Sequence, residues 1–147
     1  MSKQVLWLDN DVAYVTPYKE ALEEADYCVT LVRTVGEAGR RMHENPYDLV
    51  ILDVMVPTKS EEEEKVYPPS DTDSGTKTGL VFYRRFRQEF NARQTRVFVF
   101  TVILDEGVKK EFLAAGLPLT NFATKLALRE EADFLERIRT IMSLSGT

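Results

Sequence analysis

The sequence has little of several residue types: its 147 residues include one cysteine, Cys28, and one histidine, His43. A lone cysteine excludes a disulfide framework, and one cysteine with one histidine cannot build a zinc site. No stretch approaches the roughly 20 consecutive apolar residues of a membrane helix. Asp9 and Asp11 follow the N-terminus too closely for a signal peptide. We therefore expect a cytoplasmic protein that makes no membrane contact.

A surplus of basic residues, the usual mark of nucleic-acid binding, is also missing, so we expect no nucleic-acid partner. The sequence has 19 basic and 24 acidic residues, for a net charge of −5. Residues 60–74 hold six of the acids and one base, which leaves 18 of each elsewhere. With 44% hydrophobic and 29% charged residues, the composition is that of one globular domain over residues 1–147.

Short apolar runs at residues 5–8, 49–52 and 97–100 are typical of strands buried on both faces of a parallel sheet. Weaker strands are expected at 27–32 and 121–124. Helical spacing of apolar residues lies between and after them, at 17–25, 34–42, 80–86, 108–115 and 128–144. For the first helix, Thr16 is the expected N-cap with Pro17 at the first helical position. The alternative is an earlier start with a kink at Pro17, and Asp11 is a further candidate for the cap of this helix. Five alternating units predict a doubly wound α/β fold, a parallel sheet with helices on both faces.

Five units of typical length need about 125 residues, so about 20 are in excess. Residues 57–78 account for this excess because they lack apolar periodicity and are rich in Glu, Pro, Ser and Asp. We call this stretch the acidic insertion and predict a mobile surface loop after the third strand. Because it follows that strand directly, we hypothesise that it gates the neighbouring site or presents a docking surface for a partner.

Four of the five predicted strands end on, or lead into, polar residues. The first leads into Asp9-Asn10-Asp11, the third into Asp53, the fourth ends at Thr101 and the fifth leads into Lys125. Parallel strands bring these ends to one edge of the sheet, where ligands of open α/β folds bind. Carboxylates suit Mg²⁺, while an ammonium and a hydroxyl suit phosphoryl oxygens, so the pattern indicates phosphoryl chemistry at this edge.

Four segments together carry a resemblance to a known family: VLWLDND at 5–11, YDLVILDVMVP at 47–57, VFVFT at 97–101 and NFATK at 121–125. Their order and strand-end placement resemble the receiver domain of bacterial two-component response regulators. The resemblance implies a flavodoxin-like sheet with strand order 2-1-3-4-5. It also implies a signalling domain that is not an enzyme in the ordinary sense.

The resemblance further implies roles for individual residues. Asp53 would accept a phosphoryl group from a histidine kinase or phosphotransfer protein, and a downstream protein would read the result. Mg²⁺ would be held by Asp9, Asn10, Asp53 and the Met55 carbonyl, with Asp11 as a further candidate. The phosphoryl contacts would come from Thr101 and Lys125, and Phe122 would be the aromatic switch residue. The sequence leaves open whether the domain forms a homodimer.

Three positions depart from the family pattern. Asn10 replaces the usual second acid, which weakens the expected attraction for Mg²⁺; a unit charge 4 Å away is worth about 4 kcal/mol at an effective dielectric near 20. Val102 follows Thr101 where the family favours a small residue, so access of the phosphoryl group would be narrower. Leu126 follows Lys125 where the family has proline, so we expect no cis peptide bond there.

Two other functions remain open. A pseudo-receiver would keep the fold and signal by protein contact without phosphate. A haloacid-dehalogenase-like phosphatase is less favoured: Asp9 and Asp11 fit its first motif, but Asp53 would have no role. Its acidic pair would have to be Glu130 and Glu131, which fall inside a predicted helix.

Overall fold

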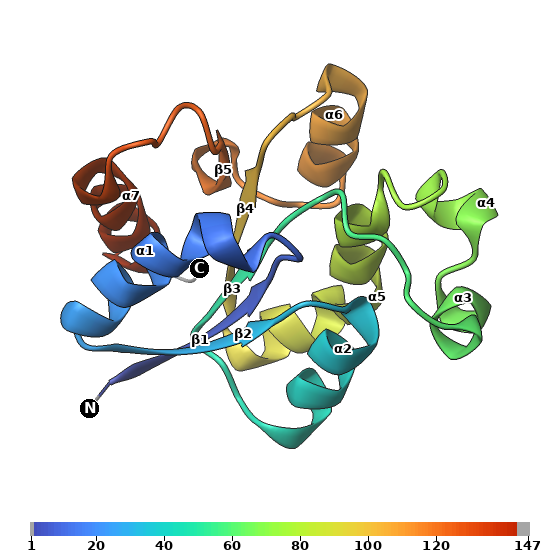
Figure 1. Ribbon diagram of the computed structural model, residues 1–147, viewed down its shortest axis with the longest axis horizontal. Coiled ribbons are helices and arrows are strands. Elements are labelled where there is room, and N and C mark those ends of the chain that lie inside the picture. The colour runs from blue at the N-terminus through green and yellow to red at the C-terminus, as the bar shows by residue number, and fades with distance from the viewer. Residues whose placement is uncertain (1, 144–147) are drawn as a thin grey trace.

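The computed structural model describes residues 2–143, in which five strands form one parallel sheet with helices on both sides (Figure 1). The strands are β1 (Lys3–Leu8), β2 (Tyr27–Val32), β3 (Leu49–Leu52), β4 (Arg96–Thr101) and β5 (Phe122–Thr124). They lie side by side in the order β2-β1-β3-β4-β5, and every neighbouring pair is parallel. The predicted fold class and strand order are therefore confirmed, including the edge position of the second strand.

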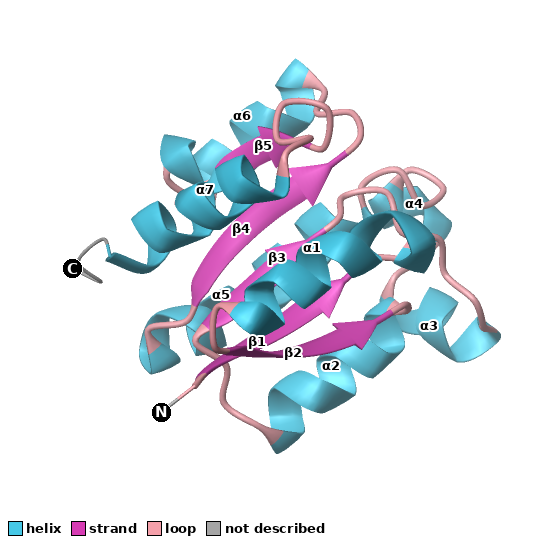
Figure 2. Ribbon diagram, turned by 60° about the vertical axis from the view of Figure 1, so that its left-hand side comes forward, coloured by secondary structure: helices cyan, strands magenta, loops and turns pink. Residues whose placement is uncertain are grey.

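The sheet separates two apolar cores because successive residues of a strand point to opposite faces. Val5 and Trp7 of β1 pack against α1 (Val12–Glu24) and α7 (Glu131–Ser143), while Leu6 and Leu8 belong to the other core. That second core includes α2 (Val35–Glu44), α5 (Thr78–Arg93) and α6 (Glu106–Ala114). Figure 2 shows α1 and α7 on one side of the sheet and α2 on the other. Burial on both faces explains why the strands read as continuous apolar runs.

The first helix begins earlier than the favoured interpretation. It starts at Val12, its N-cap is Asp11, and the Asp11 carboxylate accepts a 3.4 Å hydrogen bond from the Tyr14 backbone N–H. Pro17 lies inside the helix, so the assignment of Thr16 as N-cap is wrong and the earlier start is correct. The helix keeps Pro17 because the Asp11 cap and the burial of Val15 against the sheet offset the hydrogen bond that proline cannot donate.

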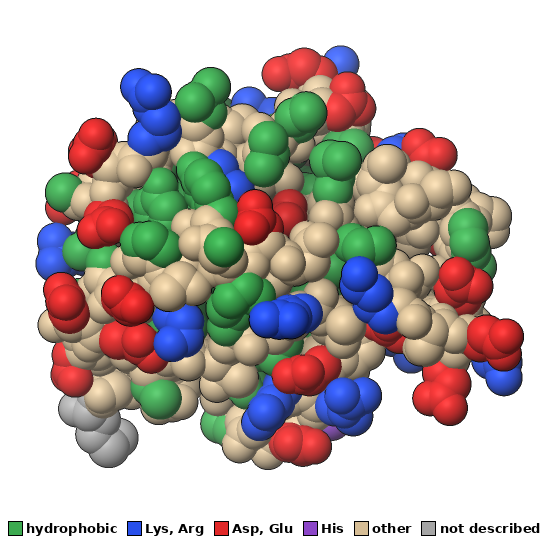
Figure 3. All heavy atoms as spheres, viewed as in Figure 1, with side chains coloured by type: hydrophobic (Ala, Val, Ile, Leu, Met, Phe, Trp, Pro, Cys, Tyr) green, Lys and Arg blue, Asp and Glu red, His purple; other side chains and the backbone are tan. Residues whose placement is uncertain are grey.

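The acidic insertion is structured, so the prediction of a loop without secondary structure is wrong. It contains α3 (Glu61–Val66) and α4 (Pro69–Thr72). The Ser60 hydroxyl caps α3 by accepting a 3.2 Å hydrogen bond from the Glu63 N–H, and the Tyr67 side chain after it is buried. The Ser-x-x-Glu spacing at 60–63 is the capping signal that would have predicted this helix. Acidic side chains gather over α3 at the right of Figure 3, where Glu61, Glu62 and Glu64 are exposed.

The remaining boundaries differ by a few residues from the predicted ones. The short helix η1 (Leu119–Asn121) precedes β5, so the fifth strand starts one residue later than expected. Helix α7 starts at Glu131, and the predicted end at Leu144 lies outside the described residues. Within residues 2–143, none of the helices has the length and apolar character needed to cross a membrane.

Candidate phosphoryl-transfer site

The polar residues predicted at the strand ends meet at one edge of the sheet. The hydrogen-bond ladder continues past the strands into these residues: the Asp9 N–H donates to the Val32 carbonyl at 3.0 Å and the Asp53 N–H to the Leu8 carbonyl at 2.9 Å. The Lys125 N–H donates to the Thr101 carbonyl at 2.7 Å. Because their backbones belong to the sheet, the side chains are held on a rigid scaffold, which is what an arranged site requires.

Asp53 is held by two donors on one carboxylate oxygen. Its Oδ1 accepts a 2.7 Å hydrogen bond from the Thr101 hydroxyl and a 3.4 Å bond from the Met55 N–H. Its Oδ2 lies 3.8 Å from the Lys125 ammonium. The side chain is 5% exposed and lines an open cleft. Oδ1 is therefore fixed by hydrogen bonds, while the contact of Oδ2 is the longer one, to the ammonium of Lys125 at 3.8 Å.

Lys125 lies closer to Asp9 than to Asp53. Its Nζ is 2.8 Å from Asp9 Oδ2, against 3.8 Å from Asp53 Oδ2, and the side chains of all three residues are almost fully buried. Asp9 Oδ1 accepts a 2.9 Å hydrogen bond from the Asp11 N–H. Burial raises the pKa of Asp9 to about 6, and the Asp53 charge adds to this effect, while Lys125 opposes it. The site thus holds two carboxylates near one ammonium, with excess negative charge.

The cleft beside Asp53 has a volume of about 520 Å³. Its lining includes Asn10, Asp11, Met55, Val102 and Ile103. Val102 and Ile103 are well exposed, so they form an apolar rim at the position where the sequence predicted narrower access. Exposed hydrophobic side chains lie next to acidic ones on the upper part of the face in Figure 3.

Apart from Lys125, the polar side chains at this edge each offer an oxygen atom as a metal ligand. Oxygen ligands suit a hard cation such as Mg²⁺. Asp9 and Asp53 bring two carboxylates close together, and Asn10 and Met55 line the same cleft. In residues 2–143, no three Asp, Glu, His or Cys side chains converge as a metal site. Asp11 caps α1 through Oδ1, which leaves Oδ2 without a hydrogen bond from the described part of the chain. The residues therefore fit a Mg²⁺ ion held by one or two carboxylates and completed by water. They do not fit a metal site built from three or more carboxylates.

The other predicted residues lie close by. Phe122 is buried, and its ring packs edge-on against Phe112 of α6 at 5.7 Å between ring centroids. Its role as a switch stays a prediction. Leu126 is 70% exposed, and the peptide bond that joins it to Lys125 is trans, as expected.

One residue at this edge was not predicted: Gly79, in the first turn of α5. Its N–H donates to the Val54 carbonyl at 3.0 Å, and a Cβ at this position would lie 2.3 Å from the Asp53 carbonyl oxygen. Only glycine allows α5 to approach the Asp53 backbone this closely. A glycine in the first turn of an amphipathic helix is a weak signal, so the sequence alone would not have revealed this contact.

Comparisons with known proteins agree with the geometry at the level of the fold. No protein-family model matches the chain, and no curated protein matches it. Among solved structures, a CheY-like receiver domain from Methanospirillum hungatei JF-1 superposes with a TM-score of 0.73 at 18% identity, over 97% of this chain and 94% of that one. A response regulator from Thermotoga maritima has a TM-score of 0.71 at 24% identity, over 98% of this chain and 100% of that one.

A chemotaxis response regulator of Vibrio cholerae gives a TM-score of 0.69 at 18% identity, over 96% of this chain and 99% of that one. The alignments cover nearly all of this chain, so the acidic insertion does not change the arrangement of the five units around it. The chain therefore has the fold of CheY-like response regulator receiver domains, over nearly its full length.

Proposed function

We propose that the chain is a receiver domain that accepts a phosphoryl group on Asp53 and signals through contact with another protein. The observation that carries the proposal is the arrangement around Asp53, which lines the cleft: one carboxylate oxygen is bonded to Thr101 and the other lies 3.8 Å from the Lys125 ammonium. The donor would be a phosphohistidine of a histidine kinase or phosphotransfer protein. A downstream protein, or a second copy of the chain, would read the change.

In the proposed transfer, Asp53 Oδ2 attacks the phosphorus of the phosphohistidine. An O–P bond forms, the P–N bond breaks, and its electron pair returns to the leaving imidazole. The product would add about −1.5 to −2 charge beside Asp53. Lys125 would then have a stronger partner than Asp9, and the Thr101 hydroxyl could donate to a phosphoryl oxygen instead of to Oδ1. A change of partner for these two groups is the local event that would bias the domain between two states.

Mg²⁺ would offset the negative charge of the carboxylates and the incoming phosphoryl oxygens. Asp9, Asp53 and the Met55 carbonyl would hold it, with Asn10 and water completing the set. Since Asn10 brings no charge, we expect weak affinity. An Asn10→Asp variant should bind Mg²⁺ more tightly, which can be measured by titration of the Trp7 fluorescence.

A phosphate-independent pseudo-receiver is the second candidate, and one observation favours it. Lys125 pairs with Asp9 at 2.8 Å, so in the structure the ammonium is held more closely by Asp9 than by Asp53, which lies 3.8 Å away. If Lys125 always stayed paired with Asp9, the domain would keep its fold and bind partners without accepting a phosphoryl group. The phosphatase alternative is disfavoured, because its nucleophile would be Asp9, which is fully buried and bound to Lys125.

The decisive experiment treats the protein with Mg²⁺ and acetyl phosphate and follows intact mass and Trp7 fluorescence. A gain of one phosphoryl mass that is lost in Asp53→Asn supports the proposal. The matched control is Asp26→Asn, an exposed aspartate that follows α1, which should phosphorylate like the unmodified chain. No mass gain and no response to beryllofluoride would favour the pseudo-receiver. Turnover of phosphate esters that depends on Asp9 would instead indicate a phosphatase.

The acidic insertion remains a candidate gate or docking surface for this site. Removing residues 58–76 should change the rate of phosphorylation or the binding of the partner if it acts in either way. Unchanged kinetics and unchanged partner binding would refute that role.

A further inference from the structure

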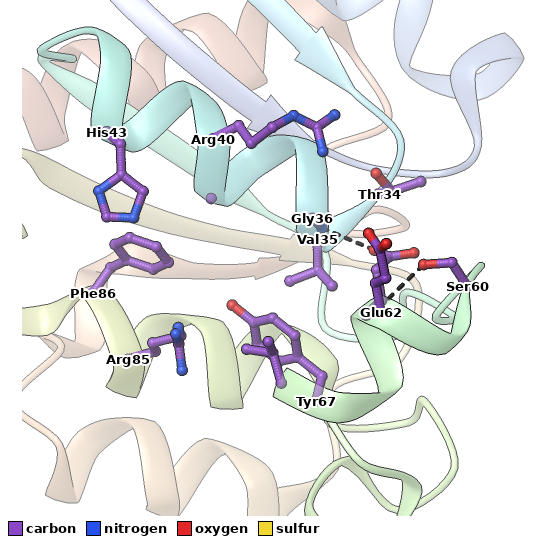
Figure 4. Close-up of a pocket in the computed structure, with 13 residues that line it drawn as sticks. Thr34, Val35, Gly36, Arg40, His43, Ser60, Glu62, Tyr67, Arg85 and Phe86 are labelled. Atoms are coloured by element: carbon purple, nitrogen blue, oxygen red, sulfur yellow. Dashed lines mark hydrogen bonds between the residues drawn. The ribbon is translucent and has the colours of Figure 1, made fainter.

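A second cavity, of about 380 Å³, lies between α2, α5 and the acidic insertion, and Asp53 is not among the residues that line it (Figure 4). Its apolar wall includes Val35 and Gly39 of α2 and Phe86 of α5, and Tyr67 closes the side toward the insertion. Gly39 leaves room in this wall, since a Cβ there would only touch the Phe86 ring at 3.5 Å. The volume lies at the small end of the range for ligand pockets, about 300–1,000 Å³, and so fits a single-ring molecule.

Donor groups without protein acceptors surround this wall. Arg85 contacts the Tyr67 ring, 5.9 Å from its centroid, and His43 contacts the edge of Phe86. In the part of the chain that the structure describes, no carboxylate oxygen lies within 4 Å of the Arg85 or Arg40 guanidinium. The Tyr67 hydroxyl makes no hydrogen bond there either, and Figure 4 shows it directed toward the space between α2 and α5.

Burial raises the pKa of Tyr67 to about 12, so at neutral pH its hydroxyl keeps its proton and can donate. Arg85 is always charged and offers a planar fork of N–H groups. One end of the cavity therefore presents a cation and a hydroxyl donor beside the flat surface of Phe86. These are groups that recognise an anion attached to an aromatic ring.

The acidic residues of the insertion that line the cavity, Glu62 and Glu63, form no ion pair with Arg85 within residues 2–143. The Glu63 charge does act on Tyr67. Glu63 uses both carboxylate oxygens elsewhere: Oε2 accepts from the Gly36 N–H and Oε1 from the Lys59 N–H, each at 2.8 Å. Its charge therefore lies at the N-terminus of α2, where the helix dipole stabilises it. Glu62 lies beside Ser60, at the opposite side of the cavity from Arg85 and His43 in Figure 4.

We propose that this cavity is a binding site for a small aromatic carboxylate, with the ring against Phe86 and the carboxylate held by Arg85 and the Tyr67 hydroxyl. A carboxylate matches the guanidinium fork with two parallel hydrogen bonds. Neither a neutral amide nor an amine of the same shape can form that charged pair. The site is separate from Asp53, and its ligand binds whether or not Asp53 accepts a phosphoryl group.

The test titrates the ¹⁵N-labelled full chain with benzoate, benzamide and benzylamine and follows backbone amide shifts. Benzoate should bind at least about 10-fold more tightly than benzamide, which is the size of effect expected for one charge-assisted contact. The largest shifts should fall at Gly36, Gly39 and Tyr67. Arg85→Gln should remove the preference for benzoate, and Gly39→Leu should block all three probes.

Arg87→Gln is the matched control, because Arg87 is exposed on the same helix and does not line the cavity. It should bind benzoate like the unmodified chain. The unfolding temperature of each variant checks that loss of binding is not loss of fold. The proposal would be overturned if benzoate and benzamide bound equally well, or if no probe bound. It would also be overturned if Arg85→Gln and Arg87→Gln lowered the affinity for benzoate by the same factor. So would benzoate shifts centred on Thr101 and Lys125, since these would place the anion at the other site.

Discussion

Replacing Asp9 by asparagine should stabilise the protein at neutral pH. The pKa of Asp9 is raised from 3.8 to about 6, mainly by burial and then by the Asp53 charge. The folded state therefore holds the Asp9 proton more tightly than the unfolded state does. Stability from this group is fully present below pH 3.8 and is lost as pH rises through 6. Asparagine keeps the shape of the neutral acid and avoids that loss.

The magnitude follows from the shift of about two units, each worth 1.36 kcal/mol, so the variant should gain about 3 kcal/mol at pH 7.5. At pH 4, close to the ordinary pKa of an aspartate, the same linkage leaves a gain of less than about 1 kcal/mol. Urea unfolding followed by fluorescence of Trp7, the only tryptophan and fully buried, measures both values.

Asp26→Asn is the control for the change of side chain alone. Asp26 is exposed, and its left-handed backbone (φ 71°) suits asparagine. It should show little change at either pH. A gain in Asp9→Asn that is the same at pH 4 and pH 7.5, or a loss of stability at pH 7.5, would refute the reasoning. The second result would mean that the ion pair with Lys125 outweighs the cost of burying the charge.

Three further variants test other contacts by the same unfolding assay. Thr101→Val removes the hydroxyl that donates to Asp53 Oδ1 and should cost about 1–3 kcal/mol, whereas Thr101→Ser should keep most of the stability. Gly79→Ala should cost several kcal/mol, since its Cβ would lie 2.3 Å from the Asp53 carbonyl oxygen and α5 would have to move. Glu63→Ala should cost about 1–2 kcal/mol by removing the carboxylate that joins α3 to α2.

Each of these variants has an internal comparison. Gly39→Ala makes the same change in a helix where the new Cβ meets only ordinary contact, so it should be neutral or stabilising by up to about 1 kcal/mol. Glu64→Ala changes an exposed glutamate of α3 and should have a small effect. If Gly79→Ala and Gly39→Ala have the same free energy of unfolding, the close approach of α5 to Asp53 does not require glycine. If Glu63→Ala and Glu64→Ala have the same free energy of unfolding, the Glu63 contact with α2 does not stabilise the structure. A Thr101→Val variant as stable as Thr101→Ser would likewise refute the role of the hydroxyl.

Much of the candidate site could be predicted because a parallel sheet leaves little freedom at its edge. Once strands are buried on both faces, the residues that follow them are brought together by the topology. Asp53, Thr101 and Lys125 follow from this rule with no knowledge of their contacts. The start of α1 could not be predicted in the same way, because Asp11 and Thr16 are both good N-caps. In the structure the helix begins after Asp11, and this earlier start places Val15 in the core.

By itself, the sequence determined the five alternating units, the doubly wound sheet and the edge at which the polar residues gather. These depend on local patterns: apolar runs, helical spacing and the residue that follows each strand. Only the tertiary structure decided that Lys125 pairs more closely with Asp9 than with Asp53. It also decided that Glu63 and Tyr67 dock the acidic insertion against α2 and α5. Such contacts join residues far apart in the chain, and their distances depend on how whole elements pack, which no local pattern encodes.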